Sequence, residues 1–275
     1  MKTILVLTDF SRKAENAALY ALRLAERTCA DLLLFHLYEQ MQAVNVPETG
    51  SWVAEDVDVF KNESLRGLLH LKDELQTQSQ NAYKPNISCF NDFGPDLAST
   101  IGELVEREKI SLVVMGAKGN DTLTHLFYGS DAYGVLDNAG CPVLFIPPGC
   151  QYDRLNTIVF ANDFKEDYTE AIQFLTQLAR VDNSHIILTH LGPYDNNAYK
   201  CLDLIKQVNP YAQVSSRLLH LENFGEQLVQ FAESVKADLV VMIHHYGLSL
   251  EKFLSGSKSK KILNHKNVPL LVLPA

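Results

Sequence analysis

Short, nearly continuous runs of apolar residues alternate along the chain with longer segments in which apolar residues recur every three or four positions. Residues 3–8, 31–37 and 112–115 read TILVLT, DLLLFHL and LVVM, a pattern typical of parallel strands that are buried on both faces. Residues 14–28, between the first two runs, carry alanine and leucine at helical spacing. A strand, a helix and a second strand with short connections predict a right-handed parallel crossover, and so an α/β fold.

The rest of the first half continues this alternation. The pattern predicts a helix over 57–79, a strand over 86–91, a helix over 96–108, a helix beginning at Ser130 and a strand within 142–147. Residues 39–57 show no such period and contain Trp52, the sole tryptophan. A long loop is the prediction there, serving either as a contact surface or as a plain insertion.

The second half of the chain repeats the first. TIVFANDF (157–164) matches the opening TILVLTDF, and Asp163 lies 154 residues after Asp9. Farther along, the spacing between matching residues becomes 127, as between Gly129 and Gly256. The second copy has therefore lost 27 residues between its second and fourth strands, where the first copy carries its loop and long helix.

Internal duplication on this scale predicts two domains of one architecture. We place them at residues 1–149 and 150–275, with the boundary just after the Pro-Pro-Gly segment at 147–149. A chain of 275 residues is long enough to give each domain a hydrophobic core of its own.

A glycine-punctuated loop follows the strand at residues 112–115. Gly116 and Gly119 can adopt positive φ and carry no Cβ, so backbone N–H groups there can approach an anion closely. Gly129 and Ser130 come next, and Ser130 is a good N-cap for a helix whose first N–H groups attract phosphate. The sequence therefore predicts two anion-binding elements beside one crevice; glycines that only form turns are the alternative.

The spacing of these residues is glycine, two residues, glycine, nine residues and then Gly-Ser. It resembles the motif that marks the ATP-binding branch of the universal stress protein family, and the likeness extends over nearly the whole chain. The resemblance implies an α/β fold of two tandem Rossmann-like domains of the adenine nucleotide alpha hydrolase kind. Each would hold a five-stranded, mostly parallel sheet with helices on both faces. It also implies that PVLFIP (142–147) and PLLVLP (269–274) pair inside one chain as a pseudo-dimer, with a homodimer as a further assembly.

In an open parallel sheet, ligands bind outside the carboxyl ends of the strands, which is where the resemblance would place an adenine nucleotide. The residues carried over from the family's site are Thr8 and Asp9 beside the adenosine, Leu37 offering backbone to adenine, Met115 and Gly116 beside the ribose, and Lys118, Gly119, Gly129 and Ser130 at the phosphates. For Asp9 the alternative is a helix N-cap, and for Lys118 a solvated side chain. The expected ligand is ATP, with ADP or AMP as alternatives.

Asp131 departs from the family pattern, in which an apolar or small residue commonly follows Gly-Ser. A carboxylate at a helix N-terminus is favoured by the helix dipole, but it would repel phosphates unless Mg²⁺ lay between them. Asp131 is therefore included in the expected nucleotide site, with Mg²⁺ as a second cofactor.

The second copy changes the glycines that the motif needs. It keeps Asp163, Leu191, Gly256 and Ser257 but has Ile243 and Tyr246 in place of the first two glycines. Side chains then fill the space in which backbone must approach phosphate, so this half is expected not to bind ATP.

Several classes of site lack their residues in this sequence. No G-x-x-x-x-G-K-[ST] motif of a P-loop NTPase occurs, and no nucleophile, base and orienting residue stand in a recognisable arrangement. His244 and His245 are adjacent, but no cysteine or carboxylate stands at zinc-like spacing, so no metal site is expected from them. The five cysteines show no C-x-x-C spacing and are expected to be reduced thiols.

Composition and charge limit the kinds of partner that the protein is expected to bind. Hydrophobic residues make up 47% of the chain and charged residues 21%, as in ordinary globular domains, and a net charge of −9 disfavours binding to nucleic acid or anionic membranes. No apolar run approaches the ~20 residues of a membrane span, and the N-terminal run is too short for a signal peptide. The expected location is the cytoplasm.

These observations favour a cytoplasmic stress-response protein in which ATP, bound in the first domain, acts as a regulatory ligand and not as a substrate. One alternative is a slow ATP hydrolase or phosphotransferase in which Asp131 holds Mg²⁺ and Lys118 stabilises the transferring phosphoryl group. Another is a nucleotide-independent interaction module that captures an unidentified protein partner through the loop around Trp52.

Overall fold

The computed structural model describes residues 2–38, 57–117, 130–162, 168–191, 196–219, 224–244 and 268–274. In the first half these residues form β1 (Thr3–Leu7), α1 (Arg12–Thr28), β2 (Asp31–Tyr38), α2 (Val57–Gln78), β3 (Ile87–Phe93), α3 (Leu97–Glu108), β4 (Leu112–Gly116), α4 (Ser130–Asn138) and β5 (Val143–Ile146). In the second half they form β6 (Thr157–Asn162), α5 (Thr169–Asp182), β7 (His185–Leu191), α6 (Asn196–Val208), β8 (Gln213–Leu219), α7 (Phe224–Ser234), β9 (Leu239–His244) and β10 (Leu270–Pro274). Most of the loop expected around Trp52 lies outside the described residues.

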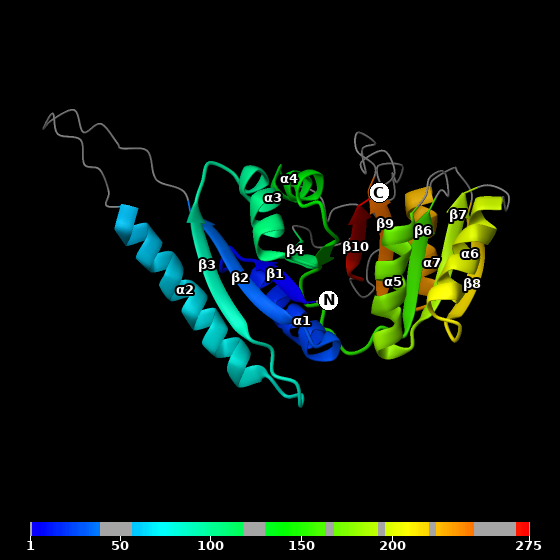
Figure 1. Cartoon of the computed structure of the whole chain (residues 1–275), viewed down its shortest axis with the longest axis horizontal. Coiled ribbons are helices and arrows are strands. Elements are labelled where there is room, and N and C mark those ends of the chain that lie inside the picture. Colours follow the sequence, from blue (N-terminus) through cyan, green and yellow to red (C-terminus); the bar gives the residue numbers. More distant parts are fainter. Residues whose placement is uncertain are drawn as a thin grey trace, which may run out of the picture.

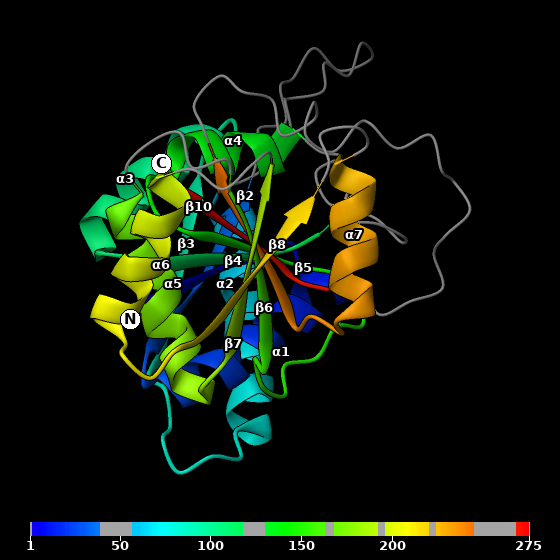
Figure 2. The same ribbon diagram turned by 90° about the vertical axis from the view of Figure 1, so that its right-hand side faces the viewer.

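The ten described strands form one sheet, in the order β3-β2-β1-β4-β5-β10-β9-β6-β7-β8 (Figure 1). Neighbouring strands run parallel except β5 and β10, which are antiparallel with Leu144 opposite Leu271. The strands rotate steadily along this order and fan out when the molecule is viewed from one end (Figure 2). The sheet therefore consists of two parallel blocks joined by one antiparallel pair.

Helices cover both faces of the sheet and give each face a hydrophobic core. On one face α1, α2, α5 and α6 pack against the strands, with Leu22, Leu68 and Leu175 completely buried. On the other face α3, α4 and α7 do the same, with Val135 and Leu228 completely buried. Because alternate residues of a strand point to opposite faces, the continuous apolar runs of the sequence fill both cores at once.

The two halves share the backbone geometry of their helix ends as well as their element order. α1 and α5 each end in a left-handed residue, Cys29 and Asn183, which lie 154 residues apart. α3 ends in the same way at Lys109, and Lys236, 127 residues later, has a positive φ just after α7. This geometry costs roughly 1 kcal/mol or more for a residue other than glycine. Its recurrence at matched positions means that both halves use the same turns.

Gly116 ends β4 where the strand passes close to the first turn of α1. A Cβ atom on Gly116 would lie 2.9 Å from the carbonyl carbon and oxygen of Lys13 and 3.2 Å from the amide nitrogen of Ala14. These are backbone atoms of a helix, which cannot move aside as a flexible side chain could. The missing side chain of Gly116 therefore sets how closely α1 lies on β4, independently of any ligand.

Asp182, at the C-terminal end of α5, ties the two halves together. Its buried carboxylate accepts hydrogen bonds from the Tyr152 hydroxyl at 2.7 Å and the Leu155 N–H at 3.0 Å, and it pairs with Arg27 of α1. Burial alone would raise the pKa of Asp182, but these three partners together hold that pKa below its usual value. The carboxylate therefore stabilises the fold while it is ionised.

Replacing Gly116 with valine should lower the free energy of unfolding by on the order of 1–3 kcal/mol, because the new side chain would force α1 away from β4. Urea denaturation followed by circular dichroism would measure the change. Gly116→Ala should act in the same direction with a smaller effect. An unchanged unfolding midpoint in both variants would show that α1 can shift away from β4 without a loss of stability.

Asp182→Asn should lower the free energy of unfolding by on the order of 2 kcal/mol at neutral pH, because a buried charge-assisted cluster loses its anion. The folded pKa of Asp182 lies below the unfolded value of about 4, so its contribution is complete above that value. It is lost as the pH falls through the folded pKa.

Urea titrations at neutral pH and in acid should therefore show a difference between Asp182→Asn and the wild type that shrinks in acid. Asp153→Asn is the matched control, because Asp153 is exposed next to Tyr152, a partner of Asp182, and its replacement should change stability little. A difference of equal size under both conditions would contradict the role assigned to the ionised carboxylate.

Candidate functional site

The described members of the expected site meet at the carboxyl edge of the first half's sheet. β1 lies between β2 and β4, with Leu7 beside Phe35 of one neighbour and Met115 of the other. Helix α1 connects β1 to β2 on one side of it, and α3 connects β3 to β4 on the other side of β1. The carboxyl end of β1 is therefore the point where the connections diverge, which is where open α/β sheets leave a crevice.

Hydrogen bonds fix the short turn that joins β1 to α1. Thr8 is buried, and its hydroxyl accepts a hydrogen bond from the Phe10 N–H at 3.0 Å. The exposed Asp9 carboxylate accepts from the N–H of Ser11 at 3.0 Å and from its hydroxyl at 2.5 Å. Ser11 in turn accepts from the Ala14 N–H at 3.4 Å. The N-cap of α1 is thus Ser11, and Asp9 supports the cap from the edge of the crevice.

Phe10 is a residue of this turn that the sequence gives no reason to single out. Its backbone is left-handed, with φ of 59°, although glycine or asparagine usually fills such a position. The turn brings the Phe10 ring to the ring of His36, with centroids 4.4 Å apart. His36 Nδ1 lies 2.8 Å from Ser64 Oγ, and burial lowers the pKa of His36 against the opposing influence of Asp9. A neutral His36 therefore packs beside the crevice as a structural residue.

The side chains near the carboxyl ends of β2 and β4 are apolar. Leu37 near the end of β2 and Met115 near the end of β4 are half-buried and pack against the core that α3 and α4 cover. Gly116 follows Met115 and lies against α1. Apolar side chains at the same edge of the sheet as the Asp9 carboxylate suit a ligand that joins a flat apolar ring to hydroxyl groups.

α4 carries the second element that the sequence predicts for anions. It begins at Ser130, as expected, and it packs against α3 so closely that a Cβ on Gly134 would lie 2.6 Å from the Ala98 Cβ. This contact fixes the helix relative to the sheet. The remaining expected contacts fall outside the part of the chain that the structure describes, namely Lys118, Gly119, Gly129 and the side chains of Ser130 and Asp131.

The described ranges contain neither a cluster of metal ligands nor a helix suited to a membrane. Among these residues, no three histidine, cysteine, aspartate or glutamate side chains gather in a way that could hold a metal ion. None of the described helices combines the length and apolar composition that crossing a bilayer requires. His245 and the side chain of His244 lie outside these ranges.

The corresponding end of the second half is built differently. Ile243 of β9 stands where Gly116 stands in the first half, and its side chain is buried in the core that α5 covers. α1 begins at Arg12, but α5 begins at Thr169, three positions after the residue that corresponds to Arg12. Because Ile243 fills the space that Gly116 leaves open, the first turn of α5 cannot lie on its sheet as α1 does. The other motif positions of this half, Asp163, Tyr246, Gly256 and Ser257, lie outside the described residues.

Comparison with known proteins identifies related sequences over both halves. Residues 1–147 and 195–274 match the model of the universal stress protein family. A universal stress protein of Methanocaldococcus jannaschii is 27% identical over 147 residues, which cover 53% of this chain and 81% of that protein. A universal stress protein of Thermus aquaticus is 31% identical over 146 residues, which cover 53% of this chain and 98% of that protein.

A solved structure shows the same fold over the whole chain. The crystal structure of a universal stress protein from Archaeoglobus fulgidus superimposes on this chain with a TM-score of 0.71 at 13% identity, over 99% of this chain and 98% of that protein. At that identity the likeness concerns the fold. The family model matches more than half of the residues of this chain, so the chain belongs to the universal stress protein family.

Proposed function

We propose that the first half of this universal stress protein binds ATP, or a related adenine nucleotide, as a regulatory ligand. The site would lie at the carboxyl ends of β1, β2 and β4 and extend to the N-terminus of α4. The observation that carries the proposal is the meeting of Asp9, Leu37 and Met115 at the point where the connections of the sheet diverge.

The described residues suit the adenosine part of such a ligand. Leu37 and Met115 offer a half-buried apolar surface to the adenine ring, and backbone groups at the end of β2 would bind its edge. Asp9, held by Ser11, would accept hydrogen bonds from the ribose hydroxyls. Gly116 lets α1 lie close to β4, so the N-terminus of α1 would border the same ligand.

The phosphates would meet residues 118–130. Glycines there would present backbone N–H groups, and the N-terminus of α4 would add its dipole from a position that the contact of Gly134 with Ala98 holds fixed. Asp131 would bind Mg²⁺ together with the phosphates, since Mg²⁺ is commonly held by one carboxylate, phosphate oxygens and water.

We further propose that residues 1–149 and 150–275 are tandem domains of one kind, paired as a pseudo-dimer through β5 and β10. The matched helix ends at Cys29 and Asn183 support this reading. The burial of Ile243 supports the absence of a nucleotide from the second domain, which would then serve as scaffold.

α1 would carry the effect of the nucleotide toward the second half. The helix begins beside the crevice and, with 17 residues, spans about 25 Å. Along it, Asn16 donates hydrogen bonds to the carbonyls of Pro147 and Cys150, and Arg27 pairs with Asp182. A bound nucleotide would favour the position of α1 that it contacts better, and it could shift the equilibrium only by that difference in affinity.

The wild type should bind ATP with micromolar affinity, and Gly129→Val should abolish binding because a side chain would keep the backbone away from phosphate. Gly256→Val is the matched control, since Gly256 repeats Gly129 in the half that lacks the other motif glycines. Calorimetric titration with ATP, ADP, AMP and cyclic AMP would measure the affinities. Mass spectrometry of small molecules released from the purified protein would identify a bound nucleotide.

The outcomes separate the competing hypotheses. Equal loss of affinity in both glycine variants would indicate a general structural defect, and a wild type that binds none of the nucleotides would refute the proposed site. Phosphate release can be followed in the same samples. Release that stops in Asp131→Ala while ATP still binds would favour slow hydrolysis over regulation.

A further inference from the structure

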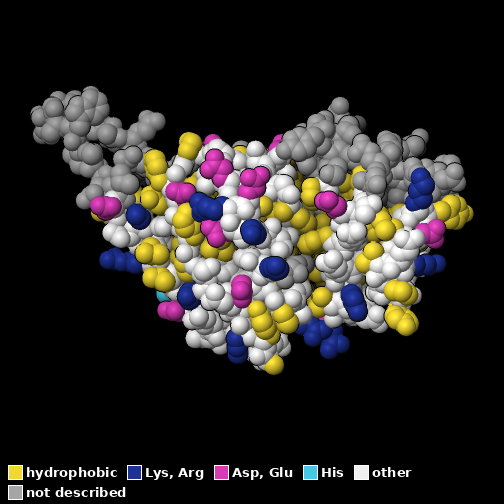
Figure 3. Space-filling model, viewed as in Figure 1, with side chains coloured by type: hydrophobic (Ala, Val, Ile, Leu, Met, Phe, Trp, Pro, Cys, Tyr) yellow, Lys and Arg dark blue, Asp and Glu magenta, His cyan; other side chains and the backbone are white. Residues whose placement is uncertain are grey.

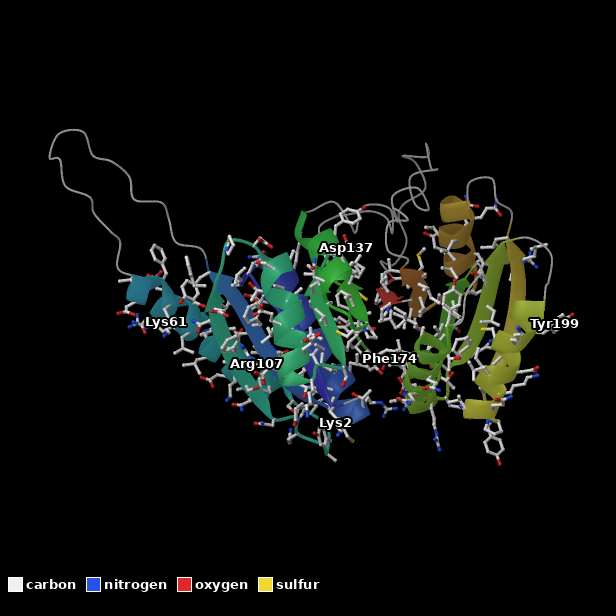
Figure 4. The ribbon with its side chains drawn as sticks, turned by 45° about the horizontal axis from the view of Figure 1, so that its top comes forward. Lys2, Lys61, Arg107, Asp137, Phe174 and Tyr199 are labelled. Atoms are coloured by element: carbon white, nitrogen blue, oxygen red, sulfur yellow. The ribbon has the colours of Figure 1, made fainter. Side chains whose placement is uncertain are left out.

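A second open site lies between the halves, apart from the proposed nucleotide site. A pocket of about 1020 Å³ opens between α5 and the amino ends of β1, β4 and β5. Its walls include Lys2, Ser111, Cys141, Glu170, Phe174 and Pro274. Hydrophobic side chains reach the surface where the two halves meet (Figure 3), and Figure 4 shows Phe174 and Lys2 at this junction.

The repeat gives the wall of this pocket a counterpart on the other side of the junction. Phe174 corresponds to Tyr20, which lies 154 residues earlier, and Glu170 corresponds in the same way to Asn16. The counterpart groove therefore lies between α1 and the amino ends of β6 and β9.

In the counterpart groove the occupant is the chain itself. Residues 147–156, which join the halves and are called the linker below, run along α1. Asn16 Nδ2 donates hydrogen bonds to the carbonyl oxygens of Pro147 and Cys150 at 3.2 and 3.1 Å. At the far end, Asp238 accepts hydrogen bonds of 2.8 and 2.9 Å from two N–H groups where the linker enters β6. A peptide segment held through its backbone thus fills this groove.

An aromatic side chain of the linker closes the same groove. The Tyr152 ring packs edge-on against Tyr20, with centroids 5.1 Å apart and planes at 88°, and Tyr20 is left only 3% exposed. Phe174 has no such aromatic cover among the described residues and stays half-buried. The pocket therefore offers to solvent the apolar surface that Tyr152 covers on the other side.

We propose that this pocket binds a segment of a partner protein that carries an aromatic residue two positions after a basic residue and that turns before the basic residue as the linker does at Pro147–Cys150. The aromatic side chain would pack on Phe174 as Tyr152 packs on Tyr20. The basic residue would stand at the position of Cys150, and its side chain would lie between Glu170 and the segment's carbonyl groups, replacing the hydrogen bonds that Asn16 donates on the other side. The inference rests on the two grooves and does not depend on nucleotide binding.

Glu170 determines the charge of the segment. Asn16 donates hydrogen bonds to linker carbonyls, whereas an ionised carboxylate can only accept, so Glu170 would repel a carbonyl and attract a cation. Glu170 is exposed and takes part in none of the ion pairs found among the described residues. Lys2 lines the same pocket, so an acidic residue just after the aromatic one would also find a partner.

A fluorescently labelled peptide with the sequence of residues 147–156, in which Cys150 is replaced by Arg, tests the proposal through its anisotropy on titration with the whole chain. We expect a dissociation constant of about 10–100 μM. Phe174→Ala and Glu170→Lys should each weaken binding about tenfold or more. Tyr199→Ala, on the exposed surface of α6, is the control that should bind as the wild type does.

A charge exchange makes the test specific. A peptide with Glu in place of Cys150 should bind the wild type about tenfold more weakly and regain its affinity for Glu170→Lys, which is an exposed position where folding is not at risk. No binding at about 1 mM peptide, or binding that Glu170→Lys leaves unchanged, would overturn the proposal. Tyramine that competes as strongly as the peptide would also overturn it, in favour of a small aromatic amine.

Discussion

The antiparallel pairing of β5 with β10 is the interaction on which the rest of this architecture depends. A block of parallel strands has two edges, and an apolar edge strand invites unwanted association. Here Val143–Ile146 pairs with Leu270–Pro274, so both inner edges disappear and each hydrophobic core continues from one half into the other. The pairing also sets the first helix of each half beside the amino ends of the other half's strands, which creates the two grooves at the junction.

Helix α1 connects the features that bear on function. Its N-terminus borders the crevice, Asn16 and Tyr20 hold the linker, and its last turn reaches Asp182. Gly116 lets this helix lie directly on β4, so a movement of α1 would have to disturb both the crevice and the packing of the linker. α5 has Ile243 in place of the glycine contact, and among the described hydrogen bonds it meets the linker through Asp182, at its C-terminal end.

Much of the fold could be predicted because buried parallel strands leave continuous apolar runs, and runs of similar sequence recur in the second half of the chain. The run at residues 3–8 forms β1, and α4 begins at Ser130, close to the predicted start of that helix. Features without a periodic signal could not be predicted. Nothing in the sequence marks the left-handed backbone of Phe10, and two partners of Asp182 lie 30 and 155 residues away. The glycine spacing pointed to a crevice, but the contact of Gly116 with the backbone of α1 depends on how closely the helix packs.

One chain carries both halves, so β5 meets β10 without an encounter between molecules. In a dimer of separate chains the paired fraction depends on protein concentration by mass action. The linker keeps the two strands at a high effective concentration, and its contacts with Asn16 and Tyr20 hold it in place. The paired state therefore persists however scarce the protein is. Neither half has to remain complementary to an identical copy of itself, which leaves each free to change its sequence alone.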